Sequence, residues 1–279
     1  MQNKNVIGVI LCLLLFLVGF VFHGNISMYY NISGFLVVIG GTFGATLLTY
    51  RMDRIMIVYK VLVASYKIKK IKDPEDIVEI LVDLSVKSKF KGLLSLQEDE
   101  EETSVLFLRR ALGLLVDGYK GDAIRDILST EMYFFRRRRE DCERVLRTMA
   151  ELFPSFGLVG SVVGLIGMLA GIGSTATILA TIPIALTSTL YGIILANFLC
   201  IPFAGNIREQ TDQELLLQKI IMEGVIAIEK EVDPRSLERK LKSFLTPSSR
   251  NVKLVSLKRI QERFNIVPQN KEKKSGKPS

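Results

Sequence analysis

The sequence lacks charge over one unusually long stretch. Residues 152–207, 56 in all, include no Asp, Glu, Lys, Arg or His, although 24% of the whole chain is charged. A membrane-spanning helix needs about 20 apolar residues, so this stretch is too long for one span and suits two. Glycines and hydroxyl side chains distinguish it from a purely apolar segment. Because a protein that moves cations alone usually keeps a carboxylate inside the membrane, a cation path here requires a charge from another chain.

Cysteines are also few, and they show no metal-binding pattern. Cys12, Cys142 and Cys200 are far apart, so we expect free thiols and no metal site. Hydrophobic residues make up 48% of the chain, and the mean hydropathy is +0.29. In a chain that is also rich in charge, these values indicate membrane segments that alternate with charged aqueous segments.

Four segments are long enough to cross a membrane. They cover residues 6–22, 32–50, 152–171 and 180–204. The first resembles a signal peptide, with Lys4 ahead of an apolar core. No small-residue cleavage site follows it, so we expect the chain to retain this span.

Basic residues are distributed unevenly between the connecting segments. Segments 23–31 and 172–179 contain no Lys or Arg, whereas residues 51–150 contain 20 and residues 205–279 contain 16. Cytoplasmic loops are enriched in Lys and Arg, which predicts that both termini and the middle block are cytoplasmic. This topology and attraction to anionic lipid explain the net charge of +8, so we expect no nucleic-acid partner.

The cytoplasmic blocks have the pattern of helices, without a convincing β-strand. Asp followed by Pro is a typical helix start, because Asp caps the helix and Pro has no N–H to leave unpaired in the first turn. Predicted helices run from Asp73 to Gly92, from Asp122 toward Phe153, over residues 215–231, and from Asp233 to near Leu245.

The sequence therefore predicts an all-α membrane protein with four transmembrane helices. A helical cytoplasmic domain separates the second span from the third, and a helical cytoplasmic tail follows the fourth. The predicted boundaries are 1–50 for the first two spans, 51–150 for the cytoplasmic domain, 151–207 for the hairpin of spans three and four, 208–247 for the tail, and 248–279 for a basic, partly disordered C-terminus.

Three features leave alternatives open. Lys87, Lys89 and Lys91 precede the acidic residues 98–102, and the two groups form either a solvated helix–turn–helix or a docking face for a partner. Four arginines at 136–139 lie either at lipid head groups or on an extended cytoplasmic helix. The remaining feature is a pair of prolines, Pro154 and Pro202, which mark either helix boundaries or hinges.

One face of the predicted third span carries small residues. Its glycines are spaced three and four apart, which places them on one side of a helix: Gly157, Gly160, Gly164, Gly167 and Gly171. Small residues let membrane helices approach closely. We expect this face, and Gly192 in the similar face of the fourth span, to pack against a partner helix.

Two hydroxyls of the hairpin are predicted to lie at the same depth. With a turn near residue 175, Ser161 and Thr189 are each 14 residues from it on antiparallel helices. Either they form a polar site for a cation, with Thr187 and Ser188 as further candidates, or they bond backbone carbonyls of their own helices. Hydroxyls cannot neutralise a cation, so the missing acid must come from the helix that packs on the glycine face.

Three segments also show a family resemblance. They are residues 154–169, PSFGLVGSVVGLIGML, residues 185–197, ALTSTLYGIILAN, and residues 40–50, GGTFGATLLTY. These segments resemble the MotA/PomA family of bacterial flagellar motor stator subunits, and the resemblance extends over residues 5–247. TolQ and ExbB proteins share the hairpin motif more loosely and have one early span where this chain is predicted to have two. A TolQ/ExbB-like energiser of an envelope protein is therefore the alternative.

The resemblance implies an ion channel that generates torque in the bacterial inner membrane, not an enzyme. Five A subunits would surround two single-span B subunits, and an aspartate of the B subunit would bind the transported ion. Ion flow would drive flagellar rotation, which serves chemotaxis, through contact with the rotor protein FliG. No cofactor is implied beyond the transported proton or sodium ion.

The resemblance also implies roles for individual residues. Pro154 and Pro202 match functional prolines, and Ser161 and Thr189 match positions near the ion path. Lys89, between Lys87 and Lys91, matches the basic position that faces the rotor. The acidic counterpart falls on Gln97, a departure that Glu98 could offset. Ser161 also departs from the family pattern, because sodium-driven members tend to have threonine there. The identity of the transported ion, proton or sodium, therefore stays open.

Overall fold

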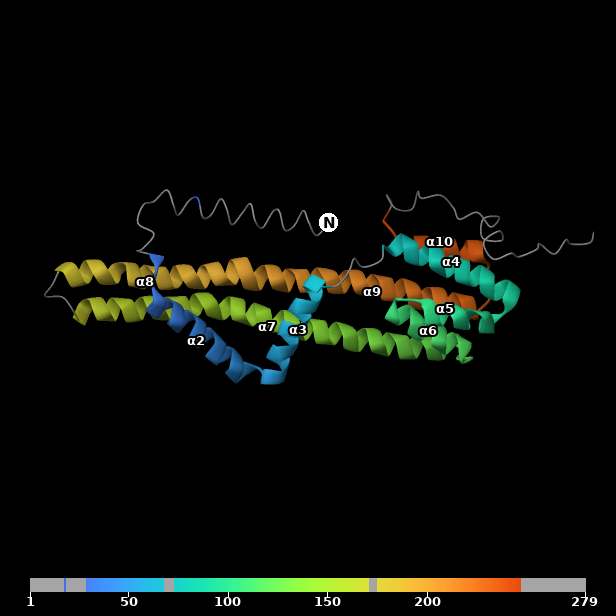
Figure 1. Cartoon of the computed structure of the whole chain (residues 1–279), viewed down its shortest axis with the longest axis horizontal. Helices are drawn as coiled ribbons and strands as arrows, with labels where there is room; N and C mark the ends of the chain where they lie inside the picture. Colours follow the sequence, from blue (N-terminus) through green and yellow to red (C-terminus); the bar gives the residue numbers. More distant parts are fainter. Residues whose placement is uncertain (1–17, 19–28, 68–72, 171–174, 247–279) are drawn as a thin grey trace, which may run out of the picture. The chain divides into compact units, whose positions relative to one another are not determined.

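The structure is a computed structural model that describes residue 18 and residues 29–67, 73–170 and 175–246 (Figure 1). Every regular element in these residues is a helix, which confirms the all-α prediction. The expected first span at residues 6–22, apart from residue 18, and the basic residues 248–279 lie outside the described part of the chain. Cys12 and Gly171 also lie outside it.

The chain divides into two compact units. One comprises Met1–Lys67 and Glu140–Arg208, and the other comprises Ile68–Arg139 and Glu209–Ser279. Two long helices, α7 (Gly121–Ala170) and α9 (Ile201–Glu229), each contribute residues to both units. The units are described separately below.

The first unit contains the apolar helices. Its elements are α2 (Ile32–Thr49), α3 (Met52–Lys67), the later part of α7, α8 (Thr175–Leu195), a π-helical turn η3 (Ala196–Cys200) and the start of α9. Three helices of the described chain are long and apolar enough to cross a membrane: Ile32–Thr49, Gly121–Leu169 and Ala185–Glu229. In Figure 1, the end of α7 and α8 run side by side. Because α8 begins at Thr175, most of the loop expected at 172–179 is helical.

The two prolines are not helix boundaries. Pro154 lies inside α7, which continues to Ala170, and Pro202 follows η3 in an uninterrupted helical run. The N–H of Ile201 donates to the carbonyl of Ala196, the wider spacing of a π-turn directly before Pro202. Membrane helices tolerate proline because neighbouring groups and local π geometry satisfy the freed carbonyls. The boundary interpretation is therefore wrong at both positions.

Small apolar clusters hold the first unit together. One joins Val38 of α2 to Phe153, Ala196 and Cys200. A second contains Val58 of α3, and its other members lie on α7 and α9: Cys142, Val145, Leu146, Ala204 and Ile207. Both described cysteines, Cys142 and Cys200, are buried free thiols, as predicted.

The second unit is a helical domain with a larger core. It contains α4 (Pro74–Lys91), η2 (Leu93–Leu96), α5 (Gln97–Glu102), α6 (Leu106–Val116), the start of α7, the later part of α9 and α10 (Pro234–Lys242). Apolar side chains from five helices meet in its core, among them Leu81, Leu112, Leu128, Ile221 and Leu237. The predicted starts at Pro74 and Pro234 are confirmed, and Asp233 caps α10 by accepting from the Arg235 N–H.

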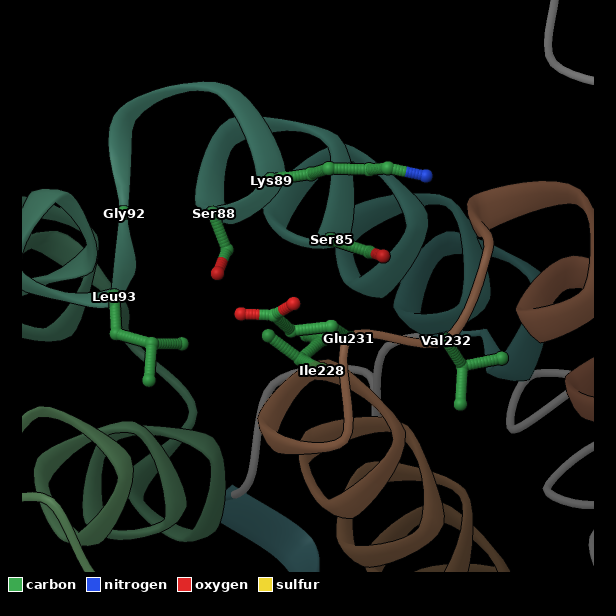
Figure 2. Close-up of a pocket in the computed structure, with 8 residues that line it drawn as sticks. All are labelled: Ser85, Ser88, Lys89, Gly92, Leu93, Ile228, Glu231 and Val232. Carbon is green, nitrogen blue, oxygen red and sulfur yellow. The ribbon is translucent and has the colours of Figure 1, made fainter.

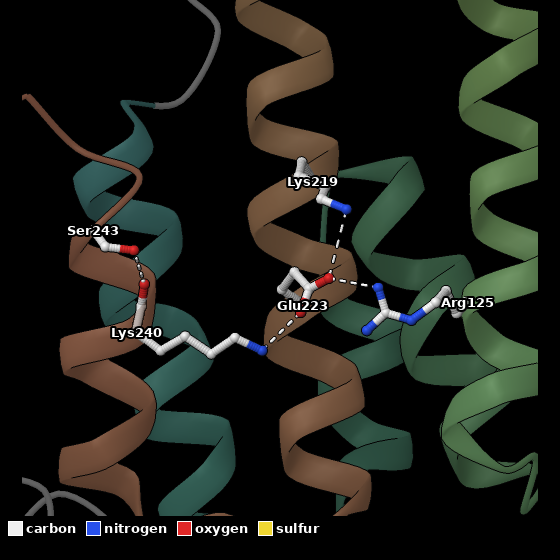
Figure 3. A network of polar contacts seen from close by, with 5 residues as sticks. All are labelled: Arg125, Lys219, Glu223, Lys240 and Ser243. Atoms are coloured by element: carbon white, nitrogen blue, oxygen red, sulfur yellow. Dashed lines mark hydrogen bonds and ion pairs between the residues drawn. The ribbon is translucent and has the colours of Figure 1, made fainter.

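One buried carboxylate joins three helices of this second unit. The Glu223 side chain on α9 is 9% exposed and accepts from Arg125 of α7 and Lys240 of α10, each at 2.7 Å (Figure 3). Lys219 lies 3.5 Å away. Burial raises the pKa of Glu223, but the hydrogen bonds from Arg125 and Lys240 outweigh it and lower the pKa from 4.5 to about 2.

Replacing Glu223 with Gln should destabilise the second unit by roughly 1.5–3 kcal/mol, the range for hydrogen bonds to charged groups. Because the pKa is lower in the folded state, the carboxylate stabilises fully above pH 4.5 and loses this effect as the pH falls toward about 2. Thermal unfolding of the detergent-solubilised protein across this pH range measures both effects. The exposed Glu209 on the same helix provides the control, Glu209→Gln. Equal stability of Glu223→Gln and wild type at neutral pH would contradict the assignment.

Candidate functional site

Ser161 of α7 and Thr189 of α8 lie in direct contact. Their hydroxyl oxygens are 2.6 Å apart, which confirms the predicted equal depth on the two helices. Ser161 also contacts the carbonyl oxygens of Gly157, at 3.2 Å, and Ala185. Thr189 lies 3.3 Å from the same Gly157 carbonyl. Ser161 therefore bonds a carbonyl of its own helix, Thr189 contacts a carbonyl of the other helix, and the cation site stays a prediction.

This hydroxyl pair is a polar cluster in an uncharged surrounding. Two hydroxyls have two hydrogens between them, too few to donate to every contact at once, so their hydrogens can be redistributed among alternative bonds. Together with the carbonyls of Gly157 and Ala185, the pair presents four oxygen atoms between the helices. Oxygen ligands of this kind can bind a water molecule or a partly dehydrated cation, but they supply no negative charge.

Thr187 and Ser188 do not join the hydroxyl pair. Thr187 is buried and accepts a hydrogen bond from the amide nitrogen of the Asn31 side chain at 3.1 Å. Ser188 is fully buried, and its side chain packs against Gly34 of α2 and Gly160 of α7. These two side chains therefore pack toward α2, and the four predicted site residues form two separate groups.

Sequence reasoning missed the contact that joins α2 to α8. The Asn31 side chain caps α2 by accepting from the Gly34 N–H at 3.0 Å, and the Asn31 N–H donates to the Tyr191 hydroxyl at 2.9 Å. The Tyr191 ring also meets Phe35 edge-on, with centroids 5.8 Å apart. An Asn directly before an apolar helix is a recognisable cap signal, but its long-range partners cannot be read from sequence.

The glycine face packs against a helix of the same chain. A Cβ atom added at Gly157 would lie 3.0 Å from the Thr189 Cα, and one added at Gly164 would lie 2.9 Å from the Ala185 Cα. Gly160 lies against Ser188 in the same way. On the opposite helix, a Cβ at Gly192 would lie 3.0 Å from the Pro154 Cα.

The expectation that all six glycines face a partner helix is therefore wrong for the four in these contacts. They let α7 and α8 approach closely enough for the hydroxyl pair to form. Gly167 differs, because a Cβ there would meet none of the described atoms within 4 Å. Gly171 lies outside the described residues.

The lysine cluster of the second unit divides into buried and exposed members. The Lys87 side chain is only 8% exposed, with its ammonium 2.6 Å from Asp99 and 3.7 Å from Glu98. The Lys87–Asp99 pair is therefore largely shielded from solvent, unlike a solvated surface pair, and Lys87 has little surface for a partner. Lys89 is 52% exposed, and its ammonium lies 3.6 Å from Asp233.

The other candidates of this face lie on its surface. Lys91 is exposed, as are Gln97 and Glu98 at the start of α5, where the Glu98 side chain is 87% exposed. Of the arginines at 136–139, Arg139 is half-buried beside Glu214, at 3.8 Å, and over the ring of Phe135. All four arginines lie within α7.

Comparisons with known proteins relate the chain to flagellar motor components. A model of the MotA/TolQ/ExbB proton channel family matches residues 99–220. The chemotaxis protein PomA of Vibrio alginolyticus is 30% identical over 234 residues, which cover 84% of this chain and 91% of that protein. Motility protein A of Treponema phagedenis is 30% identical over 250 residues, which cover 90% and 96% respectively.

Solved structures give the same result. The flagellar MotAB stator complex from Bacillus subtilis contains a chain that matches with a TM-score of 0.81 at 28% identity, covering 88% of this chain and 96% of that chain. The C. jejuni MotAB structure matches with a TM-score of 0.82 over 92% of this chain and 100% of that chain. At 24% identity, this second match shows a shared fold.

Proposed function

Because the chain belongs to the MotA/PomA family of flagellar motor stator subunits, we propose that it conducts protons or sodium ions together with a B subunit and turns a rotor. It is a channel component that generates torque rather than an enzyme. Its relatives named motility protein A and PomA favour this function over the TolQ/ExbB-like alternative.

The hydroxyl pair is the observation that carries this proposal. Ser161 and Thr189 present oxygen atoms to one another inside a stretch without a charged side chain. They can replace part of the hydration shell of a sodium ion or position a water molecule that passes a proton. The charge that balances the ion would come from an aspartate of the B subunit. The proposed site is therefore shared between two kinds of chain, and this chain provides the uncharged half.

The proposed assembly places five copies of the chain around two B subunits in the bacterial inner membrane. Each copy would have four spans and cytoplasmic termini, which the distribution of Lys and Arg supports. Large apolar side chains of α7 stay exposed on the described chain, among them Leu158, Val162, Ile166 and Leu169. Such a surface suits lipid or neighbouring subunits. Among the described residues, no atom lies within 4 Å of a Cβ placed at Gly167, which supports a role for this position in contacting the B subunit.

Expression in a host that lacks its own stators tests the proposed function. The full chain, produced with its B subunit, should restore swimming, whereas the chain alone should not. Membrane insertion of both chains without any restored rotation would contradict the stator function. Restoration of an envelope function in place of swimming would favour the TolQ/ExbB-like alternative.

Lys89→Glu should lower stator recruitment and torque, since Lys89 is the candidate basic contact with the rotor protein FliG. The side chain is half exposed, so charge reversal should leave insertion and folding intact. Torque from tethered cells and the amount of chain in the membrane measure the two effects. Lys120→Glu, which reverses another exposed charge of the second unit, is the matched control. Torque equal to wild type in Lys89→Glu would exclude a docking role for this lysine.

A further inference from the structure

A hollow with both polar and apolar lining lies beside Lys89 in the second unit. It has a volume of about 180 Å³ and is lined by residues of α4, the start of η2 and the C-terminal end of α9 (Figure 2). The lining residues are Ser85, Ser88, Lys89, Gly92, Leu93, Ile228, Glu231 and Val232. In Figure 2, the carboxylate of Glu231 and the hydroxyl of Ser88 point toward one another.

Glu231 occupies a backbone position that usually takes glycine. At the end of α9 its N–H donates to the Ile228 carbonyl and the next N–H donates to the Ala227 carbonyl, each at 3.0 Å. This is the Schellman pattern, and Glu231 is in the left-handed region with φ of 51°. The same pattern ends α6, where Gly118 takes the left-handed position with φ of 80°. Glutamate in this conformation is strained, and strained residues at surface hollows point to a use of the side chain.

The carboxylate of Glu231 is also available for a partner. In the part of the chain that the structure describes, it has neither an ion pair nor a hydrogen bond. Two charged residues line the hollow, Lys89 and Glu231, and the Lys89 ammonium lies 3.6 Å from Asp233. Glu231 therefore provides the accessible negative charge at this hollow.

We propose that the hollow is a socket for a basic side chain of the rotor protein, with Glu231 as the residue that anchors it. The carboxylate would accept from a guanidinium or ammonium group, and the Ser88 hydroxyl would accept a further hydrogen. Leu93 and Ile228 would pack against the methylene groups of the incoming side chain. This inference rests on the proposed stator function and adds an acidic contact to the basic contact of Lys89.

The experiment compares Glu231→Gln and Glu231→Gly in the full chain, each produced with its B subunit in the host without stators. Glycine suits the left-handed backbone, so Glu231→Gly removes the carboxylate while keeping or improving the fold. Both variants should lower the number of fluorescent stators recruited per motor by about fivefold, the equilibrium factor for a contact of about 1 kcal/mol. Thermal stability of Glu231→Gly should equal or exceed that of wild type. Glu209→Gln, which removes an exposed charge elsewhere on α9, should recruit like wild type.

Each other outcome has a distinct meaning. Normal recruitment of Glu231→Gly would overturn the socket, and so would an equal defect in the control Glu209→Gln. Failure of the wild-type pair to rotate any motor would overturn the stator function itself, and the socket with it. Normal rotation by wild type with normal recruitment of both Glu231 variants would overturn the socket alone.

Discussion

Replacing Gly192 with valine should abolish rotation and lower the amount of folded chain in the membrane. A Cβ atom at this position would lie 2.9 Å from the Phe153 carbonyl carbon and 3.0 Å from the Pro154 Cα. These are backbone atoms of α7, which cannot rotate away as a side chain can. Overpacking typically costs about 1–3 kcal/mol, and here α8 must move away from α7 to relieve it. The same movement would separate Thr189 from Ser161.

Gly167→Val is the matched control for this substitution. It places the same side chain on a glycine of the same helix pair, but a Cβ at Gly167 meets no atom of the described residues within 4 Å. Thermal stability and membrane level, measured in the chain without its B subunit, should therefore stay at the wild-type values. If the two variants lose stability equally, the close packing of α7 on α8 at Gly192 is wrong.

Thr189→Val should leave the chain folded but reduce ion flow and rotation by about tenfold, which corresponds to about 1.4 kcal/mol. Valine keeps the branched shape and removes the hydroxyl that lies 2.6 Å from Ser161. Ser161 keeps its contacts with the carbonyls of Gly157 and Ala185, so the helix packing should persist. Torque and ion uptake, normalised to chain in the membrane, measure the effect.

The control for this hydroxyl is Thr49→Val in α2. Thr49 donates to the Ala45 carbonyl of its own helix at 2.9 Å, and no hydroxyl of another described helix bonds it. Its removal should leave rotation unchanged. Wild-type rotation in Thr189→Val would instead support a static scaffold in which the hydroxyls only pack.

Local and geometric rules predicted much of this fold from sequence. Pro74 and Pro234 begin helices as predicted, because helix starts depend on a few adjacent residues. The predicted cap forms at Asp233, whereas the Asp73 side chain makes no capping hydrogen bond. Ser161 and Thr189 were placed at one depth because the rise of an antiparallel hairpin fixes the level of each residue. These predictions needed no knowledge of long-range packing.

Other features depend on packing that a sequence pattern does not contain. The period of the glycines predicts which residues share a face, but not that α8 of the same chain covers Gly157 and Gly164. Charge patterning likewise does not show that Lys87 is buried beside Asp99. Nor does it show Glu231 in a left-handed position, since the usual signal there is a glycine.

The central claim is that Ser161 and Thr189 line the ion path, and the ion dependence of rotation tests it most directly. Rotation rate would be measured in tethered cells while sodium is varied at fixed pH and then pH is varied at fixed sodium, for wild type and Ser161→Ala. The account predicts that one ion sets the rate and that its half-maximal concentration shifts by about tenfold in Ser161→Ala, equivalent to about 1.4 kcal/mol of ion binding. An unchanged half-maximal concentration for the driving ion would contradict the claim.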